Sequence, residues 1–287
     1  MKTLVTGATG TIGRQLVSEL SRRGVEVRAA GHSRERIETL EGPGVEPIAV
    51  DLNEPEEVAR ALEDVHRMFL LTPFVPEFER QVANVVEAAR AAAVDHIVRL
   101  SALGAAPGAE LALAAEHGRC DELVKQSGIG WTILQPTFFQ DNLIGYQVEP
   151  IRSQSAFYGA SASGETAYVS SADIAAVAAT ILLDPAPHAG KTYALTGPEA
   201  LSDFAVAEAL SSTLGRKINY VDLSPQQLSA GMRESGTPGW IVDALVGLER
   251  VKSLGWASQV SPAVEQITGR PGERLQEFLT RNRERLA

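Results

Sequence analysis

The stretch TGATGTIG at residues 6–13 stands between a strand-like run and a helix-like run, close to the start of the chain. Residues 2–6 are mostly aliphatic or β-branched, as in a buried strand, and residues 13–23 carry apolar positions at helical spacing. A glycine triple is a weak signal alone. Between a strand and a helix it is a strong one, because that context gives each glycine a physical task.

Each glycine of this loop fits a site that receives a pyrophosphate. Gly7 permits the tight turn out of the strand, Gly10 lets the pyrophosphate approach the backbone, and Gly13 lets the helix pack closely on the strand. The loop is completed by Thr9, Thr11 and Ile12. Free N–H groups and the positive end of the helix dipole attract the phosphates. The stretch therefore predicts a Rossmann-type domain that binds a dinucleotide.

The residues that follow the second predicted strand favour NADP over NAD. A carboxylate at this point would bind the ribose 2′-OH and repel a 2′-phosphate. The chain reads His32, Ser33, Arg34, Glu35 and Arg36, so the first three positions after the strand carry no carboxylate. Either arginine can pair with a phosphate, and His32 and Ser33 can donate hydrogen bonds, so we expect NADP(H) rather than NAD(H). The alternative is that these residues are solvated charges at the start of a short helix.

Asp51 and Leu52 follow the third predicted strand. At that position an aspartate side chain can reach the amine of an adenine. Asp51 can equally be the N-cap of the helix that starts near Pro55, because Asp is among the preferred N-cap residues. The sequence leaves both interpretations open.

Strand-like and helix-like runs alternate through the first half of the chain. Strands are expected at residues 2–6, 25–30, 46–50, 67–71, 96–100 and 131–135, and helices at 13–23, 34–40, 55–62, 78–92 and 109–126. This alternation is typical of right-handed βαβ units. The strands are apolar throughout, as strands buried on both faces are. The expected fold is α/β, with a Rossmann-type doubly wound parallel sheet.

The alternation becomes less regular after residue 136. We expect a Gly/Ser/Ala-rich loop at residues 159–164, a helix at 171–183 and strands at 191–195 and 217–221, in a tail that is otherwise mostly helical. The charged residues 273–285 predict a solvated terminal helix. The expected domains are a Rossmann domain of residues 1–136 and 165–197, and a smaller, mostly helical substrate lobe of residues 137–164 and 198–287.

The composition excludes several classes of function. A net charge of -10 disfavours nucleic-acid binding, which needs clustered Lys and Arg. Cys120 is the single cysteine, so no internal disulfide can form, and the five histidines have no metal-ligand spacing, so no metal site is expected. The N-terminus has no signal-peptide pattern, and no apolar run approaches the roughly 20 residues of a membrane span. We expect a cytoplasmic protein with neither a membrane nor a nucleic-acid partner.

Further segments match a known family. They are FLLTP at 69–73, NVVEAA at 84–89, HGRCD at 117–121, SGIGWTILQP at 127–136, DIA at 173–175 and KTYALTGP at 191–198. With TGATGTIG, these segments resemble the NmrA-like family of atypical short-chain dehydrogenases/reductases over nearly the whole chain. That family includes NAD(P)H:quinone reductase type 2, triphenylmethane-dye reductase and the redox-sensing regulator NmrA. The chain departs from the family pattern at His32 and at Gln135, where the family often has Arg.

The resemblance implies roles for residues beyond the glycine loop. The residues expected to contact the nicotinamide ribose are Leu71, Thr72 and Pro73. The residues expected near the nicotinamide ring are Ser101, Pro136, Thr137 and Phe138. Asn142 is expected to face the substrate cleft. Aromatic side chains expected to line a pocket for a flat substrate are Phe74, Phe139, Tyr146 and Trp240, with Phe157 as a further candidate.

The usual catalytic acid of the wider superfamily is missing. Typical members carry Tyr-x-x-x-Lys, in which the Lys lowers the pKa of the Tyr that protonates a carbonyl oxygen. Here the corresponding positions are Leu113 and His117. His117 and Asp121 are four residues apart on one helical face and resemble the His-x-x-x-Glu of the family. His117 is either a proton donor oriented by Asp121 or, as we prefer, part of a structural hydrogen-bonded pair.

These features favour an NADPH-dependent oxidoreductase. Without a Tyr acid, hydride transfer to a quinone-like or other conjugated acceptor is more plausible than reduction of an ordinary ketone, because the acceptor delocalises the charge. The alternative from another class is a non-catalytic, NADP(H)-sensing regulatory protein of the NmrA type. A tailoring reductase or isomerase is a third hypothesis, and a monomer and a homodimer both remain open.

Overall fold

The structure is a computed structural model that describes residues 1–40, 42–76 and 78–287. The chain forms two compact units. Unit 1 comprises residues 1–136 and 171–194, and unit 2 comprises residues 137–170 and 195–287. Residues 165–170 and 195–197, which the sequence led us to expect in the Rossmann domain, lie in unit 2.

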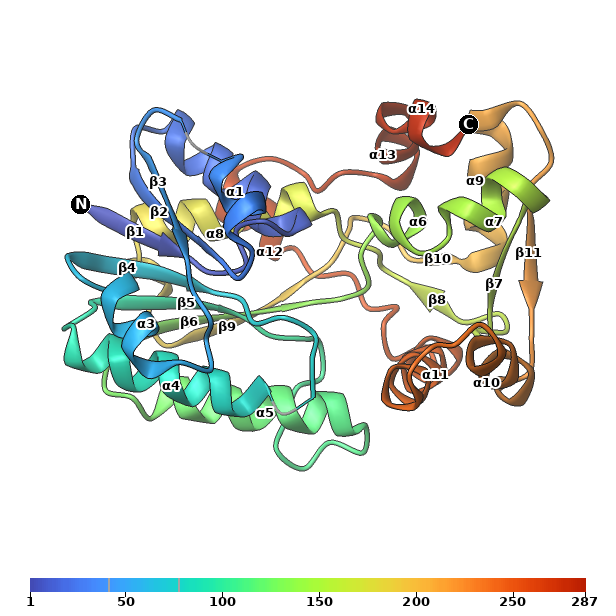
Figure 1. Ribbon diagram of the computed structural model, residues 1–287. Helices are drawn as coiled ribbons and strands as arrows, with labels where there is room; N and C mark the ends of the chain where they lie inside the picture. Colours follow the sequence, from blue (N-terminus) through green and yellow to red (C-terminus); the bar gives the residue numbers. More distant parts are fainter. Residues whose placement is uncertain (41, 77) are drawn as a thin grey trace. The chain divides into compact units, whose positions relative to one another are not determined.

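Unit 1 is built on a seven-stranded sheet with the order β3-β2-β1-β4-β5-β6-β9 (Figure 1). Its strands are β1 (Lys2–Val5), β2 (Glu26–Gly31), β3 (Val45–Ala49), β4 (Val65–Leu70), β5 (His96–Leu100), β6 (Gly130–Pro136) and β9 (Lys191–Leu195). Strands β1 to β6 pair in parallel. The expected α/β sheet is confirmed, and its strands begin and end within two residues of the predicted positions.

Helices cover both faces of this sheet, because the strands between them are apolar on both sides. The helices of unit 1 are α1 (Thr11–Arg22), α2 (Arg34–Glu38), α3 (Pro55–Ala61), α4 (Phe78–Ala91), α5 (Ala112–Lys125) and α8 (Ser171–Leu183), with a short 3-10 helix at Ala186–His188. Helix α1 packs on α8, and α4 packs against both α3 and α5. Figure 1 shows these two groups on opposite faces of the sheet.

The strand order reverses its direction at β1, which lies between β2 and β4. In open α/β sheets, ligands bind outside the carboxyl ends of the strands at this switch point. The glycine loop follows β1, and residues 71–73 follow β4. Both segments predicted to contact the dinucleotide therefore lie at the switch point.

Unit 2 combines short strands with helices. Its elements are α6 (Asn142–Gly145), α7 (Val148–Gln154), β7 (Ala156–Gly159), β8 (Glu165–Thr166), β10 (Leu201–Ser202), α9 (Asp203–Leu214), β11 (Asn219–Asp222), α10 (Pro225–Glu234), α11 (Gly239–Ser253), α12 (Ala263–Thr268), α13 (Leu275–Arg281) and α14 (Arg283–Leu286). Strands β7 and β11 pair in parallel, and β8 pairs antiparallel with β10. Among the helices of the described residues, none combines the length and apolar character that a membrane span needs.

The prediction of a solvated terminal helix at residues 273–285 is wrong. The segment forms two short helices, α13 and α14, and its apolar residues are buried. The buried residues of the two helices are Leu275, Phe278, Leu279 and Leu286, all of which join the core of unit 2. The charged residues between them cover the outer side, so a high local charge did not mean a solvated helix.

Candidate functional site

The glycine loop has the close backbone packing that the motif requires. Gly7 has φ +63°, a conformation that other residues rarely adopt. A Cβ on Gly13 would lie 2.2 Å from the carbonyl oxygen of Gly7, so α1 packs against the turn too closely for any side chain. A Cβ on Gly10 would lie 3.3 Å from the same oxygen. The loop is therefore a compact turn with its backbone exposed to an approaching ligand.

The start of α1 suits an anion. Its N-cap is Gly10, no side chain caps it, and its first turn carries no acidic residue. The first N–H groups of a helix need partners, and a phosphate can supply them. The Thr6 hydroxyl ties the loop to the segment after β4, because it lies 2.8 Å from both the carbonyl oxygen and the amide nitrogen of Leu71. These contacts hold the predicted phosphate and ribose segments together.

Arginine side chains gather beside the loop. Arg14 Nε donates to the carbonyl oxygen of Thr9 at 3.0 Å, and Arg36 Nη2 donates to the same oxygen at 3.4 Å. Arg34 and His32 are exposed near the end of β2. Sequence reasoning missed Arg14; the signal was its place in the first turn of the helix that follows the glycines. Three cations at this end of β2 suit a 2′-phosphate.

Ser33 and Asp51 have clear local roles. Ser33 is the N-cap of α2, and its hydroxyl accepts a hydrogen bond from the backbone N–H of Arg36. Asp51 accepts from both the backbone and the side-chain nitrogens of Asn53, at 2.9 Å each, and these contacts, the backbone one first, lower its pKa. The N-cap of α3 is Glu54. The N-cap interpretation of Asp51 is therefore wrong, while contact of Asp51 and Leu52 with an adenine stays a prediction.

A buried polar cluster lies at the carboxyl ends of β5 and β6. Its centre is Arg99, whose side chain is completely buried and whose Nη1 forms an ion pair with Asp121 of α5. Asp121 also accepts from the hydroxyl of Ser101 at 2.9 Å and from the side-chain nitrogen of Gln135 at 3.2 Å. Three donors from two strand ends thus converge on one carboxylate of the neighbouring helix.

His117 joins this cluster through Arg99 rather than through Asp121. Arg99 Nη2 lies 3.3 Å from His117 Nδ1, and the imidazole packs on the ring of Phe78 with centroids 4.8 Å apart. Burial, followed by the charge of Arg99, lowers the pKa of His117 to about 3. Asp121 forms no hydrogen bond with His117 among the described residues, so both the orientation of His117 by Asp121 and the preferred His117–Asp121 pair are wrong. The lowered pKa disfavours a proton-donating role for the imidazole.

Cys120 is fully buried in α5, and burial raises the pKa of its thiol to about 11. A thiol in that state is a small core residue rather than a redox centre. Phe157 is also a core residue: it is 3 % exposed and packs on Tyr220, so its candidacy for the substrate pocket is withdrawn.

The other predicted contact residues have different environments. The Thr137 hydroxyl donates to the carbonyl oxygen of Ala167 at 2.6 Å, while the ring of Phe138 is half-buried beside Tyr168. No hydrogen bond in the described part of the chain involves the carboxamide of Asn142. The exposed aromatic candidates are Phe74, Tyr146 and Trp240, whereas Phe139 is half-buried. Leu71 and Thr72 are half-buried, Pro73 is exposed and Pro136 is buried.

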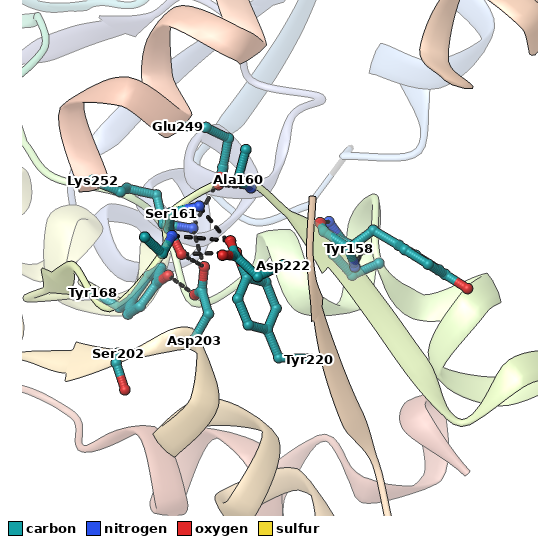
Figure 2. A network of polar contacts seen from close by, with 12 residues as sticks. Tyr158, Ala160, Ser161, Tyr168, Ser202, Asp203, Tyr220, Asp222, Glu249 and Lys252 are labelled. Carbon is teal, nitrogen blue, oxygen red and sulfur yellow. Dashed lines mark hydrogen bonds and ion pairs between the residues drawn. The ribbon is translucent and has the colours of Figure 1, made fainter. Parts of the chain in front are cut away.

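A second buried ion-pair network lies within unit 2 (Figure 2). Lys252 of α11 is 6 % exposed, and its Nζ lies 2.5 Å from Asp203 and 3.2 Å from Glu249. Asp203 also accepts from the hydroxyls of Tyr168 and Ser161. Burial lowers the pKa of Lys252, but the interactions with Tyr168, Asp203 and Glu249 outweigh it and raise that pKa above its usual range.

This network fastens the Gly/Ser/Ala-rich loop that the sequence predicted at residues 159–164. The backbone N–H groups of Ala160 and Ala162 donate to Glu249 and Asp222, at 2.8 and 3.0 Å. A Cβ on Gly164 would lie 2.0 Å from the carbonyl oxygen of Lys252, so the loop and α11 are in close backbone contact. The network was not predicted, since its members come from five separate stretches of unit 2.

Comparison with known proteins agrees with these features. Residues 7–185 match a family model described as NAD(P)H-binding. The chain is 35% identical to an NAD(P)H azoreductase of Xenophilus azovorans over 96% of both chains. It is 28% identical to quinone oxidoreductase 2 of Escherichia coli strain K12, again over 96% of both.

Solved structures are similar over almost the full length. The NADPH complex of the Escherichia coli quinone oxidoreductase has a TM-score of 0.86, at 27% identity, over 97% of this chain and 99% of that one. The triphenylmethane reductase of Citrobacter sp. in complex with NADP(H) has a TM-score of 0.87, at 25% identity, with the same coverage. The predicted family, fold and cofactor are confirmed. The chain belongs to the NAD(P)H-binding family and is an NAD(P)H-dependent oxidoreductase that binds NADP(H).

Proposed function

We propose that the protein is an NADPH-dependent reductase of conjugated acceptors such as quinones, azo compounds or cationic dyes. The observation that carries this proposal is the state of His117. It stands where the wider superfamily has a catalytic Lys, and its pKa of about 3 leaves it unprotonated at neutral pH. Neither His117 nor Leu113 can act as the acid that an ordinary ketone requires.

Two groups of residues in unit 1 suit the phosphates of NADPH. The loop of Gly7, Gly10 and Gly13 leaves its backbone open to a pyrophosphate, and Arg14, Arg34 and Arg36 supply cations for a 2′-phosphate. Bound NADPH supplies the hydride. Of the residues of unit 1, we assign Leu71, Thr72, Pro73, Ser101 and Pro136 to the nicotinamide end. The protein's own contribution is to bind, orient and exclude water.

The balance of the reaction explains the preference for a conjugated acceptor. A quinone takes the hydride and one proton to become a hydroquinone, while NADPH becomes NADP⁺. The charge that arrives with the hydride spreads over the conjugated system, so the proton can come from water after transfer. We assign Asn142 to the acceptor, since its carboxamide has no internal hydrogen bond in the described residues. The sequence-based expectation that aromatic side chains contact the flat face of the acceptor stays a prediction for Phe74, Phe139, Tyr146 and Trp240.

The names of similar proteins support the same class of acceptor. The relatives include an azoreductase, a quinone oxidoreductase and a triphenylmethane reductase, all of which carry conjugated substrates in their names. These three names share a type of electron acceptor rather than one molecule.

Steady-state oxidation of NADPH against a panel of acceptors tests the proposal. The panel contains a naphthoquinone, an azo dye, a triphenylmethane dye and, as the saturated comparison, cyclohexanone. We expect turnover with at least one conjugated acceptor, none with cyclohexanone, and a preference for NADPH over NADH of about tenfold or more. Turnover of cyclohexanone at a comparable rate, or of no conjugated acceptor, would contradict the proposal.

A matched pair of variants shows whether Asn142 contacts the acceptor. Asn142→Asp keeps the size of the side chain and removes its donor, whereas Asn219→Asp makes the same change at an exposed position of β11, away from the proposed contacts. We expect Asn142→Asp to raise the KM for the quinone and to leave the Kd for NADPH within about twofold. Equal behaviour of the two variants would remove Asn142 from the site.

A further inference from the structure

The contact between Arg99 and His117 indicates which ring nitrogen of His117 carries the hydrogen. An arginine side chain has five N–H donors, has no acceptor and stays protonated in proteins. Its contact with His117 Nδ1 at 3.3 Å therefore requires a lone pair on that nitrogen. A neutral imidazole carries one hydrogen, so the hydrogen of His117 is on Nε2. Among the described residues, no hydrogen bond involves Nε2.

Arg99 itself is fixed in place. Its side chain is fully buried, and its ion pair with Asp121 anchors the guanidinium. Asp121 is held in turn by Ser101 and Gln135, so it cannot turn toward His117 without losing these donors. Phe78 of α4 supports the imidazole from another side. The orientation and the tautomer of the histidine are thus set by side chains of four different segments.

The surroundings of His117 contain few other charges. On its own helix Glu116 accepts from the backbone N–H of Glu79, and Arg119 pairs with Glu79 of α4. On β5 the facing group is Arg99, which opposes a second hydrogen on the ring. No carboxylate among the described residues bonds directly to the imidazole, so nothing favours its charged form.

The location is the one where a ligand is expected. Arg99 is the residue before the last of β5, Ser101 follows that strand, and Gln135 is near the end of β6. These are carboxyl ends of parallel strands, and β5 is the neighbour of β4 at the switch point. Ligands of open α/β sheets bind along this edge.

We propose that Arg99 is a positioning residue that holds His117 as a neutral hydrogen-bond donor, with Nε2–H aimed at an uncharged acceptor atom of a bound ligand. This inference rests on the proposed function, which supplies the two candidate ligands. The acceptor atom belongs either to the carboxamide of the nicotinamide or to the conjugated substrate. Both present a carbonyl-type oxygen or nitrogen. His117 donates a hydrogen bond in this role and transfers no proton.

Nuclear magnetic resonance of the whole protein tests the tautomer directly. Histidines labelled with ¹³C and ¹⁵N are observed from pH 5 to pH 8, and His117 is assigned by its loss in His117→Gln. We expect a neutral ring with the hydrogen on Nε2 throughout this range. In Arg99→Met the pKa of His117 should rise by the part that the charge of Arg99 contributes, while burial keeps it below its ordinary value of about 6.5. An Nδ1–H tautomer, or a charged ring at pH 6, in the wild type would overturn the proposal.

Arg99→Met leaves a buried carboxylate without its cation, which strongly destabilises the fold. The double variant Arg99→Met with Asp121→Asn removes both charges and provides the same test in a neutral cluster. The two His117 variants below keep the ion pair intact. The proposal therefore does not depend on the stability of any one protein.

Kinetics and binding identify which ligand receives the hydrogen bond. His117→Gln keeps a side-chain N–H donor, whereas His117→Leu removes it; His66→Leu, at an exposed position of β4, is the control. We expect a loss of about three- to tenfold in His117→Leu, with a smaller loss in His117→Gln. A rise in the Kd for NADPH places the acceptor on the cofactor, and a fall in kcat/KM for the quinone at constant Kd places it on the substrate.

The outcomes separate this proposal from the proposed function. If the wild type reduces none of the acceptors, the proposed function fails, and the tautomer and the Kd for NADPH still test His117. If His117→Leu matches His66→Leu in both Kd and kcat/KM, the donor role of His117 is wrong even though the enzyme is active.

Discussion

The two buried ion-pair clusters use similar chemistry for different ends. In unit 2, the groups around Lys252 bond to one another: Asp203 and Glu249 accept from the ammonium, and Glu249 also holds the backbone of Ala160. In unit 1, the cluster around Arg99 ends at His117, whose Nε2–H has no partner among the described residues. A closed network holds a fold together, whereas an open one at the edge of a sheet can meet a ligand.

The largest expected effect is a loss of stability when a mutation breaks the closed network around Lys252. Lys252→Met leaves Asp203 buried with its charge uncompensated, so the free energy of unfolding should fall by about 3–5 kcal/mol. Adding Asp203→Asn removes that charge and should recover most of the loss. Urea denaturation of the three proteins measures both changes. A double variant as unstable as Lys252→Met would show that packing, rather than the ion pair, stabilises this part of unit 2.

The next largest effect concerns the two glycine-containing loops, at residues 6–13 and 159–164, which should respond differently to the same substitution. Gly13→Ala and Gly164→Ala each place a Cβ about 2 Å from a carbonyl oxygen, at 2.2 Å from Gly7 and 2.0 Å from Lys252. Gly13→Ala should weaken NADPH binding by about 30-fold or more, because it displaces the phosphate-binding turn. Gly164→Ala should lower the Tm and leave the Kd for NADPH within about twofold. Calorimetric titration measures the affinities, and similar Kd values for the two variants would contradict this assignment.

The smallest expected effect is a loss of stability at acid pH, and it should arise in unit 1 rather than in unit 2. Every histidine of the sequence lies in unit 1. Burial lowers the pKa of His117 to about 3 and that of His96 to about 4. Because both values lie below that of the unfolded chain, about 6.5, the unfolded state binds more protons. Stability is therefore full above pH 6.5 and falls as the pH decreases toward 4.

Between pH 7 and pH 5.5 each of these histidines should lower the free energy of unfolding by about 1 kcal/mol. Urea denaturation at several pH values measures this loss. In His117→Gln the slope should be shallower, and hydrogen exchange at pH 5.5 should show loss of protection first in unit 1. An unchanged slope in His117→Gln would mean that His117 is not the source.

The sheet of unit 1 was predictable because its signals are local. A strand buried on both faces is apolar throughout, and TGATGTIG marks the turn from β1 to α1 because its glycines stand between a strand-like and a helix-like run. The preference for NADP also came from a local pattern, the lack of a carboxylate before Glu35. Arg14 was missed even though it is in the same loop and helix, because its contact with Thr9 depends on how the loop turns.

Unit 2 was less predictable because its pairings join distant segments. Strand β7 pairs with β11, which begins 60 residues after the end of β7, and neither is long enough to show a clear pattern. The charged tail was misread for a related reason. The burial of Phe278 and Leu286 depends on the helices against which they pack, α9 among them, and not on the charges beside them.

The sequence by itself determined the fold of the first half and the class of the dinucleotide, since each depends on neighbouring residues. Only the tertiary structure decided what His117 is. Arg99 and His117 are 18 residues apart and come from a strand and a helix; burial and the charge of Arg99 together lower the pKa of the ring, and the contact is the basis of the tautomer proposed above. A residue's chemistry follows from the groups that fold against it, and those are not its neighbours in the chain.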